Sequence, residues 1–189
     1  MSLFGFIFEE TPKYTLIKQI NPTTTIRRYA PHIRIQTRYD ATPKTFGSRG
    51  FRPLAGFIFG NNVDANGSST SIAMTAPVLS QVSKESSYQM AFVLPSTFTR
   101  LDQVPQPKDD QVTPISVPEH IMAVKTFSGS GNDLELLAQK ESELRKEALE
   151  AGFTLDPDPA HVVRSFCDDL FLDKSMVQST LDTFILENE

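Results

Sequence analysis

The stretch Gly50–Asn62, GFRPLAGFIFGNN, combines an apolar helical stripe with a single cation. Its apolar residues recur at the spacing i, i+3, i+4 and i+7, which is the pattern of one face of an amphipathic helix. Those residues are Phe51, Leu54, Ala55 and Ile58. Gly60 and the two asparagines after it are typical of a helix C-terminus. The pattern predicts a helix over roughly Pro43–Phe59, which begins late or is kinked because Pro53 is a poor interior residue.

Arg52 is the only cation between Phe51 and Phe59, and two interpretations of the helix follow from the residues alone. In the first, the apolar face holds a flat apolar ligand by burial, and Arg52 pairs with a carboxylate of that ligand. The residues of this face are Phe51, Leu54, Ala55, Phe57 and Ile58. In the second, the segment is a core helix with one exposed arginine. Residue chemistry alone favours the second.

Strand patterns lie on both sides of this helix. Before it, three strands are predicted: Tyr14–Ile20, Thr25–Tyr29 and Ile33–Tyr39. In the third, apolar residues alternate with Arg34, Gln36 and Arg38, so one of its faces is expected to be in water. After the helix, further strands are predicted: Ile72–Met74, Val78–Val82, Tyr88–Leu94, an edge strand within Asp102–Glu119, and Ile121–Phe127.

A second helix is predicted after Asn132, which with Glu135 has the spacing of a capping box, and it ends at Gly152. Two more strands follow: Val162–Phe166 and Thr183–Leu186. The chain thus shows one order, two strands, a helix and two strands, in residues 14–94 and again in 112–187. Two such halves predict a mixed sheet or barrel with both helices outside. A groove between a helix and an open sheet is a common small-molecule site.

The composition is that of a globular protein with a core. The 189 residues are 39% hydrophobic and 22% charged, with a net charge of −5. An acidic chain without basic runs offers no surface to a phosphate backbone, so nucleic acid is not an expected partner. A single cysteine, Cys167, excludes an intrachain disulfide. We therefore expect one domain over residues 1–189.

Residues 1–10 are an apolar tail without a preceding basic residue. The apolar run Leu3–Phe8 is far shorter than the ~20 residues that cross a bilayer, and its flanks do not fit a signal peptide. We expect no transmembrane segment and a cytoplasmic location. The tail either packs against the body or docks onto a protein partner or a membrane surface.

The sequence contains no catalytic constellation and no metal cluster. His32, His120 and His161 lack the spacing of metal ligands, although a lone histidine can ligate haem iron. Met74 lies just before a bend forced by Pro77, and its thioether is a candidate ligand, with core packing favoured. Neither an enzyme activity nor a metal site is predicted.

Several motifs resemble those of the SOUL/haem-binding-protein family in order and spacing. They are IRRYAP (Ile26–Pro31), GFRPLAGFIFGNN (Gly50–Asn62), IAMTAPV (Ile72–Val78), Leu94-Pro95-Ser96, VPQP (Val104–Pro107) and VKTFSG (Val124–Gly129). The resemblance implies an α+β fold, a distorted eight-stranded β-barrel flanked by two α-helices and built from a duplicated ββαββ half with pseudo-twofold symmetry. It also implies non-covalent binding of haem or a related porphyrin in an apolar groove beside the first helix.

Some family members carry a proposed axial histidine immediately before the tyrosine of the first motif, where this chain has Arg28. His32 follows Tyr29 by three residues and does not occupy that place. We therefore expect no strong protein axial ligand. The candidate contacts are Arg28, His32, Phe51, Arg52, Leu54, Ala55, Phe57, Ile58 and Met74.

The predicted function is that of a carrier, buffer or sensor of a tetrapyrrole. Two alternatives stay open. One is a small-molecule effector-binding domain of the kind found in bacterial regulators, whose fold resembles this one. The other is a protein-interaction module, without a tetrapyrrole, whose groove or N-terminal tail binds a peptide.

Overall fold

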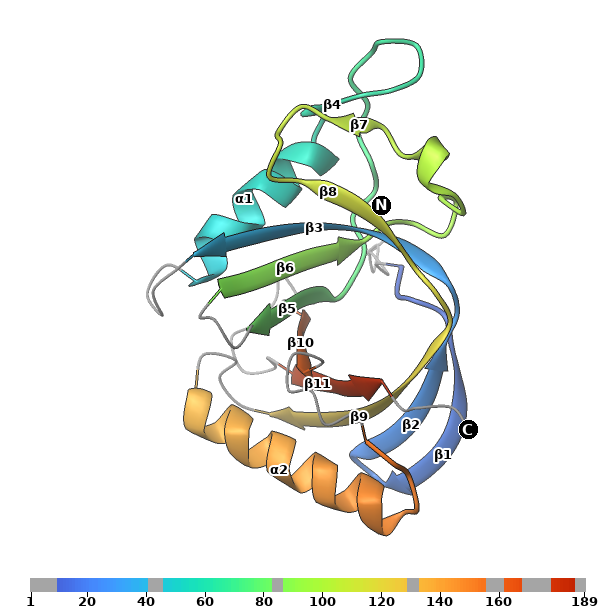
Figure 1. Cartoon of the computed structure of the whole chain (residues 1–189), viewed down its shortest axis with the longest axis vertical. Helices are drawn as coiled ribbons and strands as arrows, with labels where there is room; N and C mark the ends of the chain where they lie inside the picture. The colour runs from blue at the N-terminus through green and yellow to red at the C-terminus, as the bar shows by residue number, and fades with distance from the viewer. Residues whose placement is uncertain are drawn as a thin grey trace, which may run out of the picture.

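A computed structural model of the chain describes residues 10–40, 46–82, 87–128, 133–155, 162–167 and 178–185. The fold is α+β, with two α-helices packed on a large antiparallel sheet (Figure 1). The helices are α1, Phe46–Ile58, and α2, Leu134–Glu150. The sheet contains β1 (Tyr14–Asn21), β2 (Thr24–Tyr29), β3 (His32–Asp40), β5 (Val78–Val82), β6 (Ser87–Val93), β8 (Thr113–Val117), β9 (His120–Ser128), β10 (Val162–Cys167) and β11 (Gln178–Ile185). A separate pair joins β4 (Asn62–Val63) to β7 (Gln106–Pro107), and a 3-10 turn spans Leu101–Gln103.

The strands of the sheet follow the order β1-β2-β9-β11-β10-β5-β6-β3-β8. Its edge strands β1 and β8 do not pair with each other in the described residues, so the eight-stranded barrel is not confirmed. The pairings of the two halves correspond: β3 pairs with β6 as β9 pairs with β11, and β5 pairs with β6 as β10 pairs with β11. The two halves of the chain thus share both the order of their elements and the way in which their strands pair.

One ladder pairs two long segments, β2–β3 and β8–β9, whose two halves lie toward opposite ends of the strand order (Figure 1). It keeps one register throughout: Thr24 pairs with Lys125, Tyr29 with His120, His32 with Val117 and Gln36 with Thr113. This register places Pro31 opposite Pro118. Neither proline has a backbone N–H, so the ladder is interrupted on both strands at the same level and bends there.

The bend also shifts the alternation of side chains by one residue. Ile26 and Ile33 are an odd number of residues apart and would face opposite sides of an uninterrupted strand. Both are nevertheless buried against a helix, Ile26 in the cluster that includes α2 and Ile33 in the cluster that includes α1. We call the helix-facing side of the sheet its outer face and the other side its inner face.

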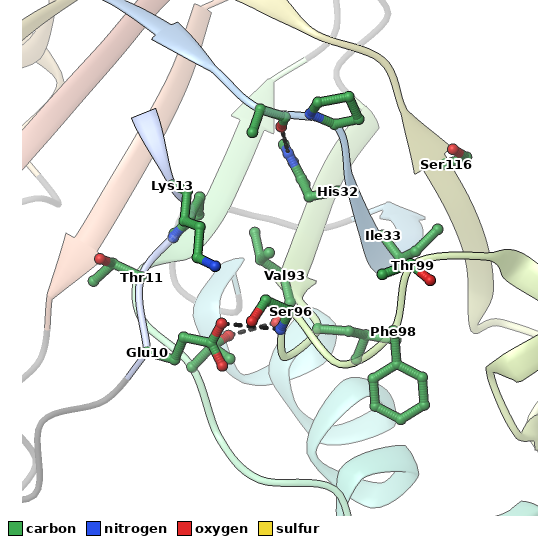
Figure 2. Close-up of a pocket in the computed structure, with 15 residues that line it drawn as sticks. Glu10, Thr11, Lys13, His32, Ile33, Val93, Ser96, Phe98, Thr99 and Ser116 are labelled. Atoms are coloured by element: carbon green, nitrogen blue, oxygen red, sulfur yellow. Dashed lines mark hydrogen bonds between the residues drawn. The ribbon is translucent and has the colours of Figure 1, made fainter. Parts of the chain in front are cut away.

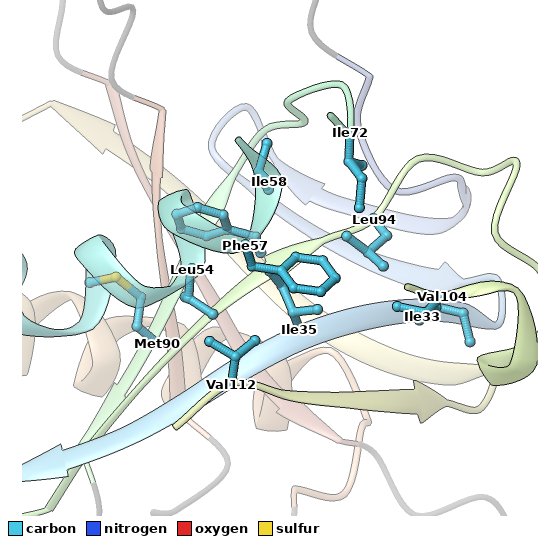
Figure 3. Close-up of a cluster of buried hydrophobic side chains, with 11 residues drawn as sticks. Ile33, Ile35, Leu54, Phe57, Ile58, Ile72, Met90, Leu94, Val104 and Val112 are labelled. Carbon is cyan, nitrogen blue, oxygen red and sulfur yellow. The ribbon is translucent and has the colours of Figure 1, made fainter. Parts of the chain in front are cut away.

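The apolar stripe of α1 packs on the outer face of β3 and β6 (Figure 3). Leu54, Phe57 and Ile58 are only 0%, 1% and 2% exposed. Burial of one such side chain contributes about 1.5–3 kcal/mol. In the structure, these three residues are therefore part of the hydrophobic core, as the second interpretation of the helix predicted.

The C-terminus of α1 is closed as its sequence predicts. Gly60 has a φ of 107°, a conformation that side-chain-bearing residues rarely adopt. Its N–H bonds to the Phe57 carbonyl at 3.3 Å, and the Asn61 N–H bonds to the Gly56 carbonyl at 2.8 Å. These two bonds make a Schellman motif, which satisfies carbonyls that the helix leaves free.

Three local predictions differ from the structure. The N-cap of α2 is Asp133, whose carboxylate accepts from the N–H groups of the first turn, so the prediction of Asn132 is wrong by one residue. Ile72–Met74 is not a strand, and the single bridge nearby joins Glu10 to Thr75, one residue beyond this segment. The last strand begins at Gln178 rather than Thr183. The predicted tail at residues 1–9 and the helix start at 43–45 lie outside the described residues.

A buried ion pair fixes α2 to the outer face of β9. Lys125 is 5% exposed, and its Nζ lies 2.7 Å from a Glu147 carboxylate oxygen and 3.3 Å from the Thr24 hydroxyl. The Thr24 hydroxyl also donates to Glu147. Burial alone would raise the pKa of Glu147, but hydrogen bonds from Lys125, Thr24 and Asn21 together with the Lys125 charge lower it. The carboxylate is thus needed to compensate the buried ammonium.

Glu147→Ala is expected to lower the free energy of unfolding by about 2–3 kcal/mol, because it leaves the buried Lys125 ammonium with only the more distant Glu143 carboxylate, at 3.7 Å, as a described counter-ion. The matched control is Glu150→Ala, whose carboxylate lies 3.8 Å from the exposed Lys146 and whose removal costs about 0.5 kcal/mol or less. Urea denaturation of both variants measures the difference. Equal losses would show that the pair does not hold α2.

Candidate functional site

A pocket of about 290 Å³ opens at the break between β2 and β3 (Figure 2). Three segments surround it: Glu10–Lys13, Ala30–Ile33, and the end of β6 with the residues after it as far as Thr99. In Figure 2, Glu10 and Lys13 lie on one side, Phe98 and Thr99 lie on the other, and His32 lies between them. None of the lining residues belongs to α1.

The segment Glu10–Lys13 is held against the pocket at both of its ends. The Glu10 carboxylate accepts the Ser96 N–H at 2.9 Å, and hydrogen bonds from Ser96 lower the pKa of Glu10. The backbone carbonyl of Glu10 accepts from the Ala76 N–H at 3.0 Å, and that of Lys13 accepts from the Ala30 N–H at 2.9 Å. The pocket wall on this side is therefore held by two backbone hydrogen bonds and by the Glu10 carboxylate.

Two histidines meet on the inner face at the proline break. His32 and His120 have ring centroids 5.7 Å apart, and His120 stacks on Tyr29 at 5.5 Å. The His32 Nδ1 lies 3.0 Å from the Ala30 carbonyl, and the His120 Nδ1 lies 2.9 Å from the Pro118 carbonyl. A carbonyl only accepts, so each Nδ1 donates its proton and each neutral ring keeps the Nε2 lone pair for another partner.

Burial lowers the pKa values of both histidines. For His32, the charges of His120 and Arg34 lower the pKa further, against an opposing hydrogen bond to Ala30. For His120, the Arg34 charge acts in the same direction. Both rings are therefore expected to be neutral at pH 7.

Arg34 lies on the inner face beside these rings. Among the described residues its Nε has no hydrogen-bond partner, although it is buried, and the guanidinium forms one long hydrogen bond, 3.4 Å, from Nη2 to the Gln36 amide oxygen. Burial lowers the pKa of this guanidinium. Among the residues whose side chains the structure describes, no carboxylate forms an ion pair with Arg34. The predicted wet face of β3 is thus partly buried and basic at this position.

The structure separates the residues predicted to contact a ligand into three groups. Leu54, Phe57 and Ile58 are in the core, as described above. Phe51, Arg52, Ala55 and Met74 are exposed or half-exposed: Arg52 is exposed, and Phe51 and Met74 are each 37% exposed. His32 lines the inner-face pocket, whereas Arg28 is half-exposed on β2 with its Nε 3.6 Å from Glu119.

One side of α1 collects its exposed apolar residues. Phe51, Ala55 and Phe59 recur every four residues and therefore line one side of the helix, next to Arg52. Phe59 is 67% exposed, and its N–H continues the helical pattern by bonding to the Ala55 carbonyl at 2.9 Å. Phe51 also packs edge-on against Phe92 of β6 at 5.3 Å. We call Phe51, Arg52, Ala55 and Phe59 the α1 ridge.

Several site residues were missed in the sequence. Lys13 and Arg34 carry no motif of their own, and Phe59 lies within the GFRPLAGFIFGNN motif but outside the apolar stripe predicted from it. The two histidines do carry one, since Pro31-His32-Ile33 and Pro118-Glu119-His120-Ile121 recur at corresponding places in the two halves. Comparison of the halves at these prolines is the signal that pairs His120 with His32.

The described residues contain no group of three or more histidine, cysteine, aspartate or glutamate side chains that can hold a metal ion. Within the same residues, no helix is both long and apolar enough to cross a membrane.

Comparison with known proteins identifies the family of this fold. Residues 9–168 match the SOUL heme-binding protein family, and the chain belongs to it. A search of curated proteins found no match.

Two solved structures are similar to the chain at low sequence identity. The EcmrR C-terminal domain is 10% identical, with a TM-score of 0.62, and the match covers 88% of this chain and 98% of that one. A hydrolase from Listeria innocua is 8% identical, with a TM-score of 0.58, over 95% and 94% of the two chains. At these identities the likeness concerns the fold alone.

The lowered pKa values of His32 and His120 predict acid sensitivity. Their folded-state pKa values lie below the ordinary 6.5, so the unfolded state binds more protons at mildly acidic pH. Their contribution to the free energy of unfolding is fully present above pH 6.5 and is lost as the pH falls through the folded-state values.

NMR titration of the ring protons should place both midpoints below 6.5. Urea denaturation between neutral and acidic pH should show a smaller loss for the His32→Phe, His120→Phe double variant than for the unchanged chain. Midpoints at or above 6.5, together with the same pH dependence of the free energy of unfolding in the double variant and the unchanged chain, would contradict the lowered pKa values of the two histidines.

Proposed function

We propose that this protein binds haem or a related tetrapyrrole non-covalently on the α1 ridge, as a carrier, buffer or sensor. Membership of the SOUL heme-binding protein family carries the proposal. The ridge has the chemistry that such a ligand needs. Phe51, Ala55 and Phe59 offer apolar area to a flat macrocycle, and its burial would supply most of the affinity. Bound there, the tetrapyrrole would supply its own iron or ring chemistry.

Arg52 is the residue that would orient the ligand. It is exposed and forms no ion pair with a residue that the structure describes, so its guanidinium is available to a propionate. Met74, which is half-exposed, and Arg28 remain proposed secondary contacts. Leu54, Phe57 and Ile58 act from the core, because they hold α1 on the sheet and so keep the ridge rigid.

The iron, if present, would lack a strong protein axial ligand from the described histidines. His32 and His120 meet on the inner face, whereas α1 packs on the outer face. Ligand and protein would then interact mainly through the ring and the propionates. The alternative of an effector-binding domain without a tetrapyrrole draws on the fold that the chain shares with the EcmrR C-terminal domain.

Hemin titration of ridge variants tests the proposal. Phe59→Ser and Arg52→Gln are each expected to weaken binding about tenfold, by ~1.4 kcal/mol, which is the scale of a partly buried ring or of a charged hydrogen bond. Both side chains are exposed, so neither change should alter the fold. Absorbance at the Soret band measures the affinity.

Matched controls lie on the exposed side of α2. Leu149→Ser removes another exposed apolar side chain, 57% exposed, and Lys146→Gln removes another exposed cation. Neither should change hemin affinity. Iron-free protoporphyrin should show the same pattern at an affinity within about tenfold of hemin. Equal losses of affinity in the ridge and control variants would contradict the proposed location. Failure of the unchanged chain to bind hemin saturably would contradict the proposed function.

A further inference from the structure

The inner face at the proline break holds three nitrogen-rich side chains without a carboxylate among them. His32 and His120 are in ring contact, and the Arg34 charge acts on both of them. The Arg34 Nε is buried and has no hydrogen-bond partner in the part of the chain that the structure describes. A cation taken out of water without a counter-ion is costly, so such a cluster favours the approach of a negative charge.

A metal ion fits this cluster less well. Two histidines with fixed Nδ1 protons do present Nε2 lone pairs, which is how metal-binding histidines are commonly oriented. However, the described residues supply no third ligand, and the adjacent Arg34 repels a cation. The Arg34 charge favours an anion instead.

The pocket reaches this cluster at His32, and its lining includes neither Arg34 nor His120. His32 lines the pocket, and so does Val93, the cross-strand neighbour of Arg34. Lys13 also lines it and is exposed, which adds a second cation near the opening. Glu10, the carboxylate in the lining, is engaged by the Ser96 N–H.

The remaining lining is suited to an apolar body. Pro12, Val93, Leu94 and Phe98 contribute apolar surface on facing sides of the pocket. The volume, about 290 Å³, is at the lower end of the range for small-molecule sites and suits a ligand smaller than a tetrapyrrole.

We propose that the pocket at the β2–β3 break binds a small amphipathic carboxylate. Its anionic group lies toward Lys13, His32 and Arg34, and its apolar body lies against Val93, Leu94 and Phe98. This site is separate from the α1 ridge, because no lining residue belongs to α1. The proposal goes beyond tetrapyrrole binding and does not depend on it.

Titration of the full chain with 3-phenylpropionate and with its amide, followed by NMR, tests the proposal. The two probes share one apolar body and differ in charge. The acid is expected to shift the His32 ring signals and the amides of residues 10–13 and 93–99. It should bind about tenfold more tightly than the amide, the scale of one charged hydrogen bond.

Two variants address the cations. Arg34→Gln and Lys13→Gln should each reduce the preference for the acid over the amide, whereas Lys108→Gln, an exposed cation that bonds Ser69, should leave it unchanged. If Arg34→Gln does not fold, the exposed Lys13→Gln still decides the question. Equal binding of acid and amide, shifts confined to other residues, or no shift at all would overturn the proposal.

Arg52→Gln separates this proposal from the tetrapyrrole proposal. It should leave binding of 3-phenylpropionate unchanged while it weakens binding of hemin. Loss of both would place the two ligands in one site and overturn the inference of a separate pocket.

Discussion

Two prolines that lie opposite each other in the ladder between β2–β3 and β8–β9 set the shape of this protein. Pro31 and Pro118 fall at the same level of a register that is otherwise unbroken from Thr24 to Gln36. Because neither can donate a hydrogen bond, the two strands bend together, and the alternation of side chains shifts by one residue. Ile26 can therefore pack against α2 and Ile33 against α1, although both isoleucines lie in the first half of the chain.

The same bend gives the two faces of the sheet different chemistry. On the outer face, α1 rests on buried apolar residues and presents its ridge of phenylalanines and Arg52 to solvent. On the inner face, the shift in alternation brings Tyr29 and His32 both into ring contact with His120, near Arg34, whose Nε has no hydrogen-bond partner among the described residues. One surface thus suits a flat apolar ligand with carboxylates, and the other suits a smaller anion.

Local patterns in the sequence predicted most helices and strands. They could not predict which elements pack or pair with one another, because that depends on contacts between residues distant in the sequence. The spacing of Leu54 and Ile58 marked a buried helix face but could not say whether a sheet or a ligand covers it, since both require the same apolar residues. Ile72–Met74 has the composition of a strand yet is not one, and the bridge nearest to it is made by Thr75, which pairs with Glu10. The pocket joins Lys13, His32 and Phe98, which are distant in the sequence and have no common motif.

The central claim is that the bend places the tetrapyrrole site on the outer face, away from the inner-face histidines. Paramagnetic broadening of backbone amide signals by hemin, with zinc protoporphyrin as the diamagnetic reference, locates the iron directly. The account predicts that broadening is strongest at residues 49–59 of α1 and its C-terminal turn, with His32 and His120 little affected. Broadening centred on residues 30–33 and 118–121 would contradict it and would place the tetrapyrrole at the proline break instead.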